Sequence, residues 1–169
     1  MGDFLDAAKK TREYLDYLET HYRCVQEAVD IVSQSMLLSV NSSLLQLLRK
    51  EVEQHDMSKF SEAEFVQYRR KFFPTDADKL VPEEVKSGFD SAWEHHKENN
   101  PHHFERRMFE TNGVMGEVNG MHMICDWVAM SLAKGEKSPR KYFESKREEM
   151  KLPQWLEACV YTVCNYMES

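Results

Sequence analysis

The pattern of apolar and polar positions along the chain has the period of a helix. Apolar residues recur three and four positions apart over long stretches, which is typical of amphipathic α-helices. The longest stretch runs from about Phe4 to Leu38, and its apolar stripe consists of Leu15, Leu18, Val25, Ala28, Val32 and Ser35 or Met36. Alternation with a period of two, which indicates a strand, is absent from the sequence. The pattern predicts an all-α protein.

Capping residues and helix breakers divide the rest of the chain into shorter predicted helices. These span about 44–56, 61–73, 82–99, 121–134, 138–149 and 153–167, and a short helix carries His102, His103 and Phe104. The helix at 61–73 starts with the capping-box pattern of Ser61 and Glu64, whereas the segment 111–120 is expected to be a loop. Neither a repeat nor a long linker divides the chain, so we expect a single all-helical domain over residues 1–169.

The amino-acid composition limits the binding partners and the cellular compartment that we expect. The formal net charge is -7 and 30% of the residues are charged, which argues against broad binding to a nucleic acid polymer or an anionic membrane. The first residues lack an apolar signal core, and no apolar run reaches about 18 residues, the length that suggests a membrane span. The 4 cysteines show no CxxC spacing and lie in apolar helical patterns, so we expect reduced, buried thiols and a cytoplasmic protein.

Four polar residues lie on or beside rows that are otherwise buried. His21 falls on the apolar stripe of the first helix, His55 and Asp56 end the row of the second, and Asp126 lies among apolar residues of a later helix. Burying such groups is costly unless something pairs them. Imidazole nitrogens and carboxylate oxygens together suit a divalent first-row ion such as Mn, Fe, Co, Ni or Zn. The sequence therefore predicts a metal site built from several helices.

The order of these residues resembles that of the HD-domain superfamily of metal-dependent phosphohydrolases. A histidine, then His-Asp, then a distant aspartate follow one another on helices, and "HYRCVQEAV" around His21 is similar to the pattern near that superfamily's first histidine. The separations are similar to those of small bacterial HD-domain 5'-nucleotidases, and the match covers about residues 15–135. The resemblance implies an HD-type helical bundle that binds one or two ions through His21, His55, Asp56 and Asp126. It also implies that Asp56 bridges the two ions.

The stretch "HDMSKF" at residues 55–60 adds a lysine to the resemblance. Lys59 matches the lysine of the HDxxK version, which is similar to the cyclic-dinucleotide phosphodiesterase branch and there lies near the phosphate. That branch also has an "HHExxDGxGYP" signature, whereas this chain has "HHKENNPHH", so cyclic-dinucleotide hydrolysis is not implied. More closely, "HDMSKFSEAEFVQYRRKFFP", "AWEHHKENNPHHFE" and "CDWVAMS" look like a family of bacterial and phage-encoded proteins of unknown function.

Four of the 7 histidines, His95, His96, His102 and His103, gather in the segment 95–103. His96 continues an apolar row, which places it inward, and a second ion held by His96 and His103 together with Asp56 would make a dinuclear site. Hydrogen bonds from these imidazoles to carbonyl groups around the Asn-Pro break would also account for the cluster, and so would a role in orienting metal ligands. His122 is expected near the start of its helix, where it would be solvated or cap the helix.

These residues favour a metal-dependent phosphohydrolase that acts on a small phosphorylated molecule such as a nucleotide. Asp56 and Lys59 are the candidate catalytic residues, Lys59 as a phosphate-binding group, and the histidine cluster could protonate the leaving oxygen. One alternative is a non-haem di-iron oxygenase, since HD-type helical folds also host such centres. Another is a non-catalytic structural or interaction protein whose metal ties helices together. Near the carboxyl end, a dimer surface could form from Trp155, Tyr161, Tyr166 and Met167.

Overall fold

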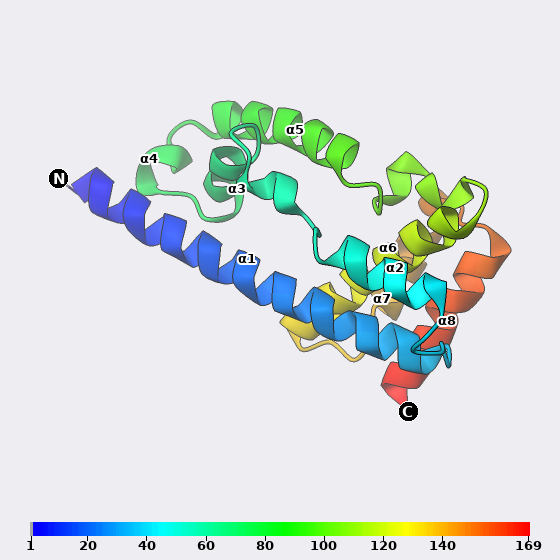
Figure 1. Ribbon diagram of the computed structural model, residues 1–169. Helices are drawn as coiled ribbons and strands as arrows, with labels where there is room; N and C mark the ends of the chain where they lie inside the picture. The colour runs from blue at the N-terminus through cyan, green and yellow to red at the C-terminus, as the bar shows by residue number, and fades with distance from the viewer. Residues whose placement is uncertain (1) are drawn as a thin grey trace. The chain divides into compact units, whose positions relative to one another are not determined.

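The protein is all-α, as the sequence pattern predicts (Figure 1). The computed structural model describes residues 2–169, and within them the chain forms α-helices and short 3₁₀ helices (η) but no strand. In chain order the elements are α1 (Gly2–Ser35), α2 (Ser43–Val52), η1 (Met57–Phe60), α3 (Phe65–Phe72), α4 (Asp76–Lys79), α5 (Pro82–Asn99), η2 (Phe104–Arg106), η3 (Met108–Glu110), α6 (Val114–Lys134), α7 (Arg140–Met150) and α8 (Gln154–Glu168).

The helices form two compact units, and each unit is made from separate parts of the chain. Unit 1 consists of Met1–Thr20 and Asp56–Asn100, and unit 2 consists of His21–His55 and Pro101–Ser169. The first half of α1 therefore belongs to unit 1 and its second half to unit 2. The expectation of a single domain over residues 1–169 stays a prediction.

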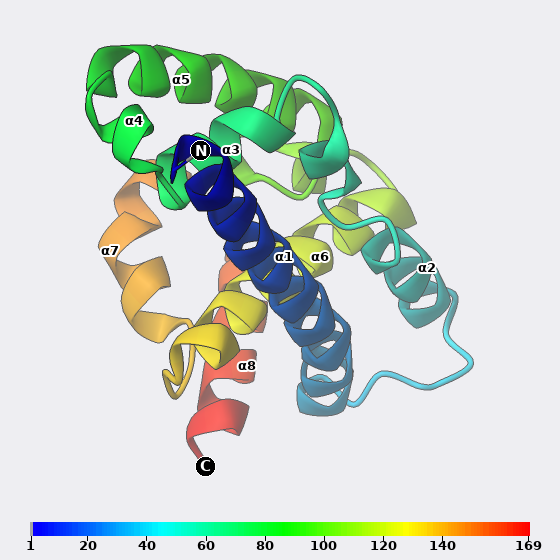
Figure 2. The same cartoon turned by 90° about the vertical axis from the view of Figure 1, so that its left-hand side faces the viewer.

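Unit 1 packs around an aromatic core. In both views of the fold α3 lies beside α5, with α4 near the start of α5 (Figures 1 and 2). The buried residues of this core are Tyr14, Leu18, Tyr68 and Ala92. Tyr14 contacts Phe65 and Phe73, with ring centroids 5.2 and 5.8 Å apart, and Tyr68 contacts Phe89 edge-on at 5.2 Å. These tilted and edge-on arrangements are the ones that aromatic rings prefer.

Unit 2 has the larger apolar core, and α6 runs through it. Helix α6 is buried on nearly all sides, with Val118, Ile124 and Val128 fully inaccessible, and α2 packs directly against it. The Ser42 side chain caps α2 by accepting a hydrogen bond from the Leu45 amide, as the capping residues predict. A helix that is apolar all round requires neighbours on every side, which explains the central place of α6.

The start of α6 differs from the sequence prediction. The segment 111–120 is not wholly a loop, because the helix begins at Val114. A Cβ atom on Gly116 would lie 2.1 Å from the Thr111 carbonyl oxygen, and one on Gly120 would lie 2.9 Å from the Trp155 ring. These glycines thus allow neighbouring groups to pack closely against the helix, where the sequence pattern predicted a loop.

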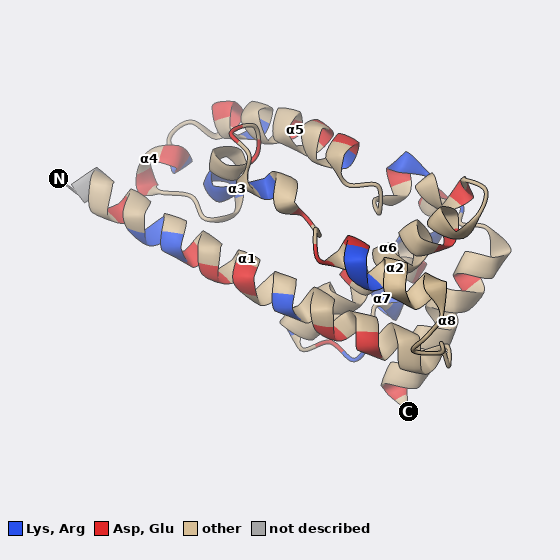
Figure 3. Ribbon diagram, in the orientation of Figure 1, with Lys and Arg blue, Asp and Glu red and all other residues tan. Residues whose placement is uncertain are grey.

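The surface carries charges of both signs. Figure 3 shows Asp and Glu interspersed with Lys and Arg along α1 and α5.

The 4 cysteines are free thiols, with Cys125 and Cys164 buried and Cys24 and Cys159 partly exposed. Within residues 2–169, no helix combines the length and the apolar character that crossing a membrane requires.

Candidate metal centre

A group of histidines surrounds His55 in the interior of unit 2. Helix α2 ends at Val52, and a turn closed by the hydrogen bond from the His55 amide to the Val52 carbonyl (3.1 Å) directs His55 inward. Its Nε2 atom lies 3.0 Å from Nε2 of His21, and its Nδ1 atom lies 2.9 Å from Nε2 of His122. All three side chains are buried. Both ring nitrogens of His55 therefore face another imidazole.

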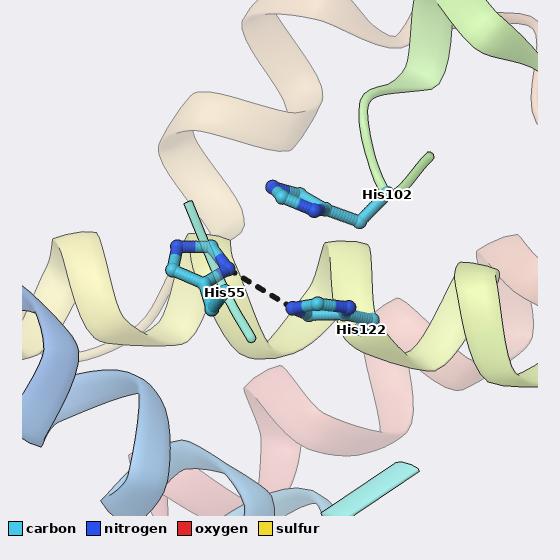
Figure 4. A group of neighbouring side chains, drawn as sticks. All are labelled: His55, His102 and His122. Carbon is cyan, nitrogen blue, oxygen red and sulfur yellow. Dashed lines mark hydrogen bonds between the residues drawn. The ribbon is translucent and has the colours of Figure 1, made fainter. Parts of the chain in front are cut away.

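His102 completes this group from the segment that follows α5. Its ring packs 4.6 Å from the His55 ring and 4.4 Å from the His122 ring, centroid to centroid. Figure 4 shows the three rings gathered together, His122 on α6 and His102 on the segment that leads to η2. One ring nitrogen from each of the three lies within 4.8 Å of the other two. These three nitrogens could thus bind a common ion.

Asp126 brings a carboxylate to the same group. It lies one helical turn after His122 on α6, and its Oδ1 atom is 3.3 Å from Nε2 of His21 and 3.7 Å from Nε2 of His55. Burial alone would raise the pKa of the Asp126 carboxyl. The hydrogen bond from His21 and the charges of the nearby histidines outweigh burial, so this pKa lies well below its usual range. The group therefore combines imidazole nitrogens with an ionised carboxylate.

Unit 1 carries a second polar group, which starts at Asp56. Asp56 has a left-handed backbone (φ 56°) and begins η1, in which the Lys59 amide donates to the Asp56 carbonyl at 2.9 Å. Aspartate tolerates this conformation better than most residues do. The Lys59 Nζ atom lies 2.6 Å from Oδ2 of Asp56, and Nε2 of His96 lies 3.3 Å from Oδ1. Both oxygens of this buried carboxylate thus have a cationic or imidazole neighbour.

Glu64 occupies a different place from the one that the capping-box pattern predicts. Helix α3 begins only at Phe65, and the Glu64 side chain makes no capping hydrogen bond. Its carboxylate instead lies between the two histidines of α5, 2.7 Å from Nδ1 of His95 and 2.8 Å from Nδ1 of His96. The capping-box prediction is therefore wrong, because the Glu64 side chain contacts α5 and is not available to cap α3.

Comparison with protein families assigns the chain to a family but not to an activity. The model of a family of unknown function (DUF5662) matches residues 10–165. The chain belongs to this family. No curated protein and no solved structure matches it. The DUF5662 family name thus leaves the chemistry to be inferred from the two polar groups.

The structure places the predicted site residues in both units. His21, His55 and Asp126 come together in unit 2, as the metal hypothesis requires, and Asp56, Lys59 and His96 lie close together in unit 1. The ring of His103 packs 4.5 Å from that of His102. The ligand roles of His103 and Asp56 and the catalytic roles of Asp56 and Lys59 stay predictions.

Two histidines of unit 2, His102 and His122, are not among the metal ligands that the sequence predicts. His122 was expected to be solvated or to cap its helix, which is wrong because α6 begins at Val114 and buries it. The spacing of four between His122 and Asp126 was the signal available in the sequence. No local signal separates His102 from its neighbour His103, since only the path of the chain after Pro101 decides which ring points inward.

Proposed function

We propose that this DUF5662 protein is a metal-dependent phosphohydrolase that acts on a small phosphorylated molecule such as a nucleotide. The observation that supports the proposal is the buried donor set around His55. His21, His102, His122 and Asp126 bring imidazole nitrogens and a carboxylate oxygen to it. This is the donor chemistry of borderline divalent ions such as Mn, Fe, Co, Ni and Zn. The residues present therefore fit a metal.

Some of the buried side chains would hold the ion, and others would bind the substrate. When bound, a divalent ion supplies Lewis acidity toward a phosphoryl group and makes water more acidic. His55, His102 and His122 would hold the ion, with His21 and Asp126 beside them. In unit 1, Lys59 pairs with Asp56, and its ammonium group is the predicted phosphate-binding group.

A non-catalytic metal-binding protein is the second candidate function. The observation that favours it is the burial of the unit 2 histidines, since His21, His55, His102 and His122 are at most 4% exposed. A site closed by protein ligands on all sides holds helices together and has no position for a substrate. The two candidate functions differ in whether one coordination position of the bound ion is open to water or substrate.

The first test is elemental analysis of the protein purified without a histidine tag. Parent, His55→Ala and Asp126→Asn proteins are compared, with His95→Gln as a control that removes a histidine of unit 1. We expect one or two equivalents of a transition metal in the parent and in the control, and about one equivalent fewer in the other two variants. A parent that stays metal-free after incubation with Mn, Fe, Co, Ni and Zn would contradict both candidate functions.

The second test distinguishes a catalytic role of the metal from a structural one. The metal-loaded protein is assayed for phosphate release from p-nitrophenyl phosphate and from nucleoside monophosphates. Hydrolysis that Lys59→Met abolishes, with the metal retained, supports the phosphohydrolase. A loaded protein that releases no phosphate and shows no exchangeable water by relaxation measurements with Mn²⁺ supports the structural role. Iron in the purified protein together with oxygen uptake would support the di-iron alternative instead.

A further inference from the structure

Glu64 is a fully buried carboxylate whose two oxygens are both used. Its exposed fraction is 0%, and its oxygens lie 2.7 and 2.8 Å from Nδ1 of His95 and of His96. An unpaired carboxylate in this position would be strongly destabilising, so its partners determine whether the unit folds. Burial alone would raise the pKa of Glu64, but hydrogen bonds from His96, His95 and Ser58 outweigh it and lower the pKa. The carboxylate is therefore ionised and accepts hydrogen bonds from both rings.

The two histidines that bind Glu64 lie in different environments. They are consecutive on α5, so their side chains leave the helix about 100° apart, and a carboxylate at the start of α3 reaches both. The His95 side chain is 38% exposed, whereas that of His96 is 1% exposed. His96 is the inner ring; it stacks on the Trp93 ring at 5.6 Å and contacts the Tyr68 ring at 5.5 Å with a tilt of 56°. These two aromatic side chains restrict its orientation.

The contacts of His96 distinguish its two ring nitrogens. Nδ1 lies 2.8 Å from the Glu64 carboxylate, 3.1 Å from Nδ2 of Asn100 and 3.2 Å from the Ser58 hydroxyl. The Asn100 amide nitrogen also donates to the Ser58 hydroxyl and to the His96 carbonyl, both at 2.7 Å. Carboxylates face both ring nitrogens, and Glu64 lies nearer to Nδ1 than Asp56 lies to Nε2, which favours Nδ1 for the single proton of a neutral ring. The other nitrogen, Nε2, faces Oδ1 of Asp56 at 3.3 Å.

We propose that Glu64 is a positioning residue, which keeps a proton on Nδ1 of His96 and presents Nε2, beside the Asp56 carboxylate, as a ligand atom for a divalent cation in unit 1. A carboxylate that accepts from one nitrogen of a histidine whose other nitrogen binds metal is a recurrent arrangement in metalloproteins. The cation part rests on the proposed function, since it places a second ion in unit 1. The tautomer part concerns only the side chains of unit 1.

The tautomer can be measured without metal or substrate. Long-range ¹H–¹⁵N correlation spectra of the chelator-treated protein, at an alkaline pH where the imidazole is neutral, report which ring nitrogen of His96 carries the proton. We expect the proton on Nδ1 in the parent and in Glu62→Gln, a matched control because Glu62 is exposed on the same turn. In Glu64→Gln we expect a loss of this preference, and in Glu64→Asp a partial recovery.

The parent spectrum alone can overturn the proposal, so the test does not depend on the folding of a variant. A proton on Nε2 of His96 in the parent contradicts it. An unchanged Nδ1 proton in a folded Glu64→Gln protein, with folding checked by circular dichroism, contradicts it too. A His95→Gln variant removes the other partner of Glu64, and we expect it to keep the parent tautomer of His96.

Cobalt binding gives a second readout that separates this proposal from the proposed function. Calorimetric titration of Co²⁺ into chelator-treated protein is expected to show two ions in the parent. His55→Ala should remove the ion of unit 2, whereas Glu64→Gln should weaken only the other ion, by about 10–100-fold. One ion in the parent that Glu64→Gln does not affect would overturn the present proposal alone. A parent that binds no ion would overturn this proposal and the proposed function together.

Discussion

The Nδ1 atom of His55 lies 2.9 Å from the Nε2 atom of His122, although 67 positions separate the two residues in the chain. At this distance two imidazole nitrogens require either a proton that they share or a cation that both bind, because two lone pairs would repel each other. His55 also meets His21 through its other nitrogen. The buried histidines of unit 2 therefore depend on one another, and each is expected to affect metal binding.

Replacing His122 with alanine should weaken the metal site of unit 2. His122 offers one of three ring nitrogens that lie within 4.8 Å of one another, so its loss removes a donor from the group. We expect the affinity for Zn²⁺ to fall by at least about ten-fold, the lower limit for losing a partner of a metal site. Competition with a chromophoric chelator measures this affinity. His95→Gln serves as the control, and equal affinities for His122→Ala and the parent would contradict the assignment.

Asp78 should make the stability of the protein depend on pH in the acid range. Burial alone would raise the pKa of this carboxyl, but hydrogen bonds from Thr75, Arg70 and Arg69 outweigh it, so the pKa lies well below its usual range. A pKa that is lower in the folded state than in the unfolded state stabilises the fold above the unfolded value. The contribution is therefore complete above about pH 4 and is lost as the pH falls toward the folded value.

The free energy of urea unfolding between about pH 6 and 2 tests this dependence. Asp78→Asn should lower stability by about 2 kcal/mol at neutral pH, as expected for charge-assisted hydrogen bonds in a buried position. It should also flatten the acid limb of the profile. Asp76→Asn is the matched control, since the Asp76 side chain is 91% exposed and pairs with the exposed Lys79. A parent profile with the same slope as that of Asp78→Asn would disprove the role of Asp78.

Replacing either of two helical glycines with alanine should change the stability of the protein, in opposite directions at the two positions. At Gly116 a Cβ atom would meet the Thr111 carbonyl oxygen at 2.1 Å, and this backbone group cannot move away easily. We expect Gly116→Ala to destabilise the protein by about 2 kcal/mol, as overpacking does. At Gly88 the obstacle is the far end of the flexible Gln67 side chain, so Gly88→Ala should stabilise by about 0.5–1 kcal/mol through helix propensity.

Thermal unfolding of the two variants decides this comparison. The prediction requires melting temperatures on opposite sides of the parent value. If both alanines raised the melting temperature, the close approach of the Thr111 carbonyl oxygen to Gly116 would not be a constraint.

Removing the hydroxyl of Tyr14 should stabilise unit 1. The residue is 0% exposed, and among residues 2–169 its oxygen has no hydrogen-bond partner. A buried polar group without a partner lowers stability, so Tyr14→Phe should raise the free energy of unfolding by about 1 kcal/mol. The same change at Tyr142, which is 43% exposed, should have little effect. Denaturant titration of the two variants measures the difference, and a loss of stability in Tyr14→Phe would reveal a partner for this hydroxyl.

The sequence by itself determined the all-α class and most of the helices. An apolar stripe with a period near 3.6 is a local property, and so are the cap at Ser42 and the start of α5 at Pro82. It also identified His21, His55 and Asp126 as polar residues on buried rows. The cost of burying a polar group is large enough that its position in such a row already indicates a partner.

Only the tertiary structure decided which other side chains complete the two polar groups. Glu64 follows a local capping pattern but binds α5, and His122 is buried in α6 beside His55, which follows the end of α2. His102 and His103 are alike in sequence, and the path of the chain separates them. Local patterns determine which face of a helix is buried, because backbone hydrogen bonds and side-chain period are local. They cannot determine which distant side chain meets that face, because this depends on packing between helices far apart in the chain.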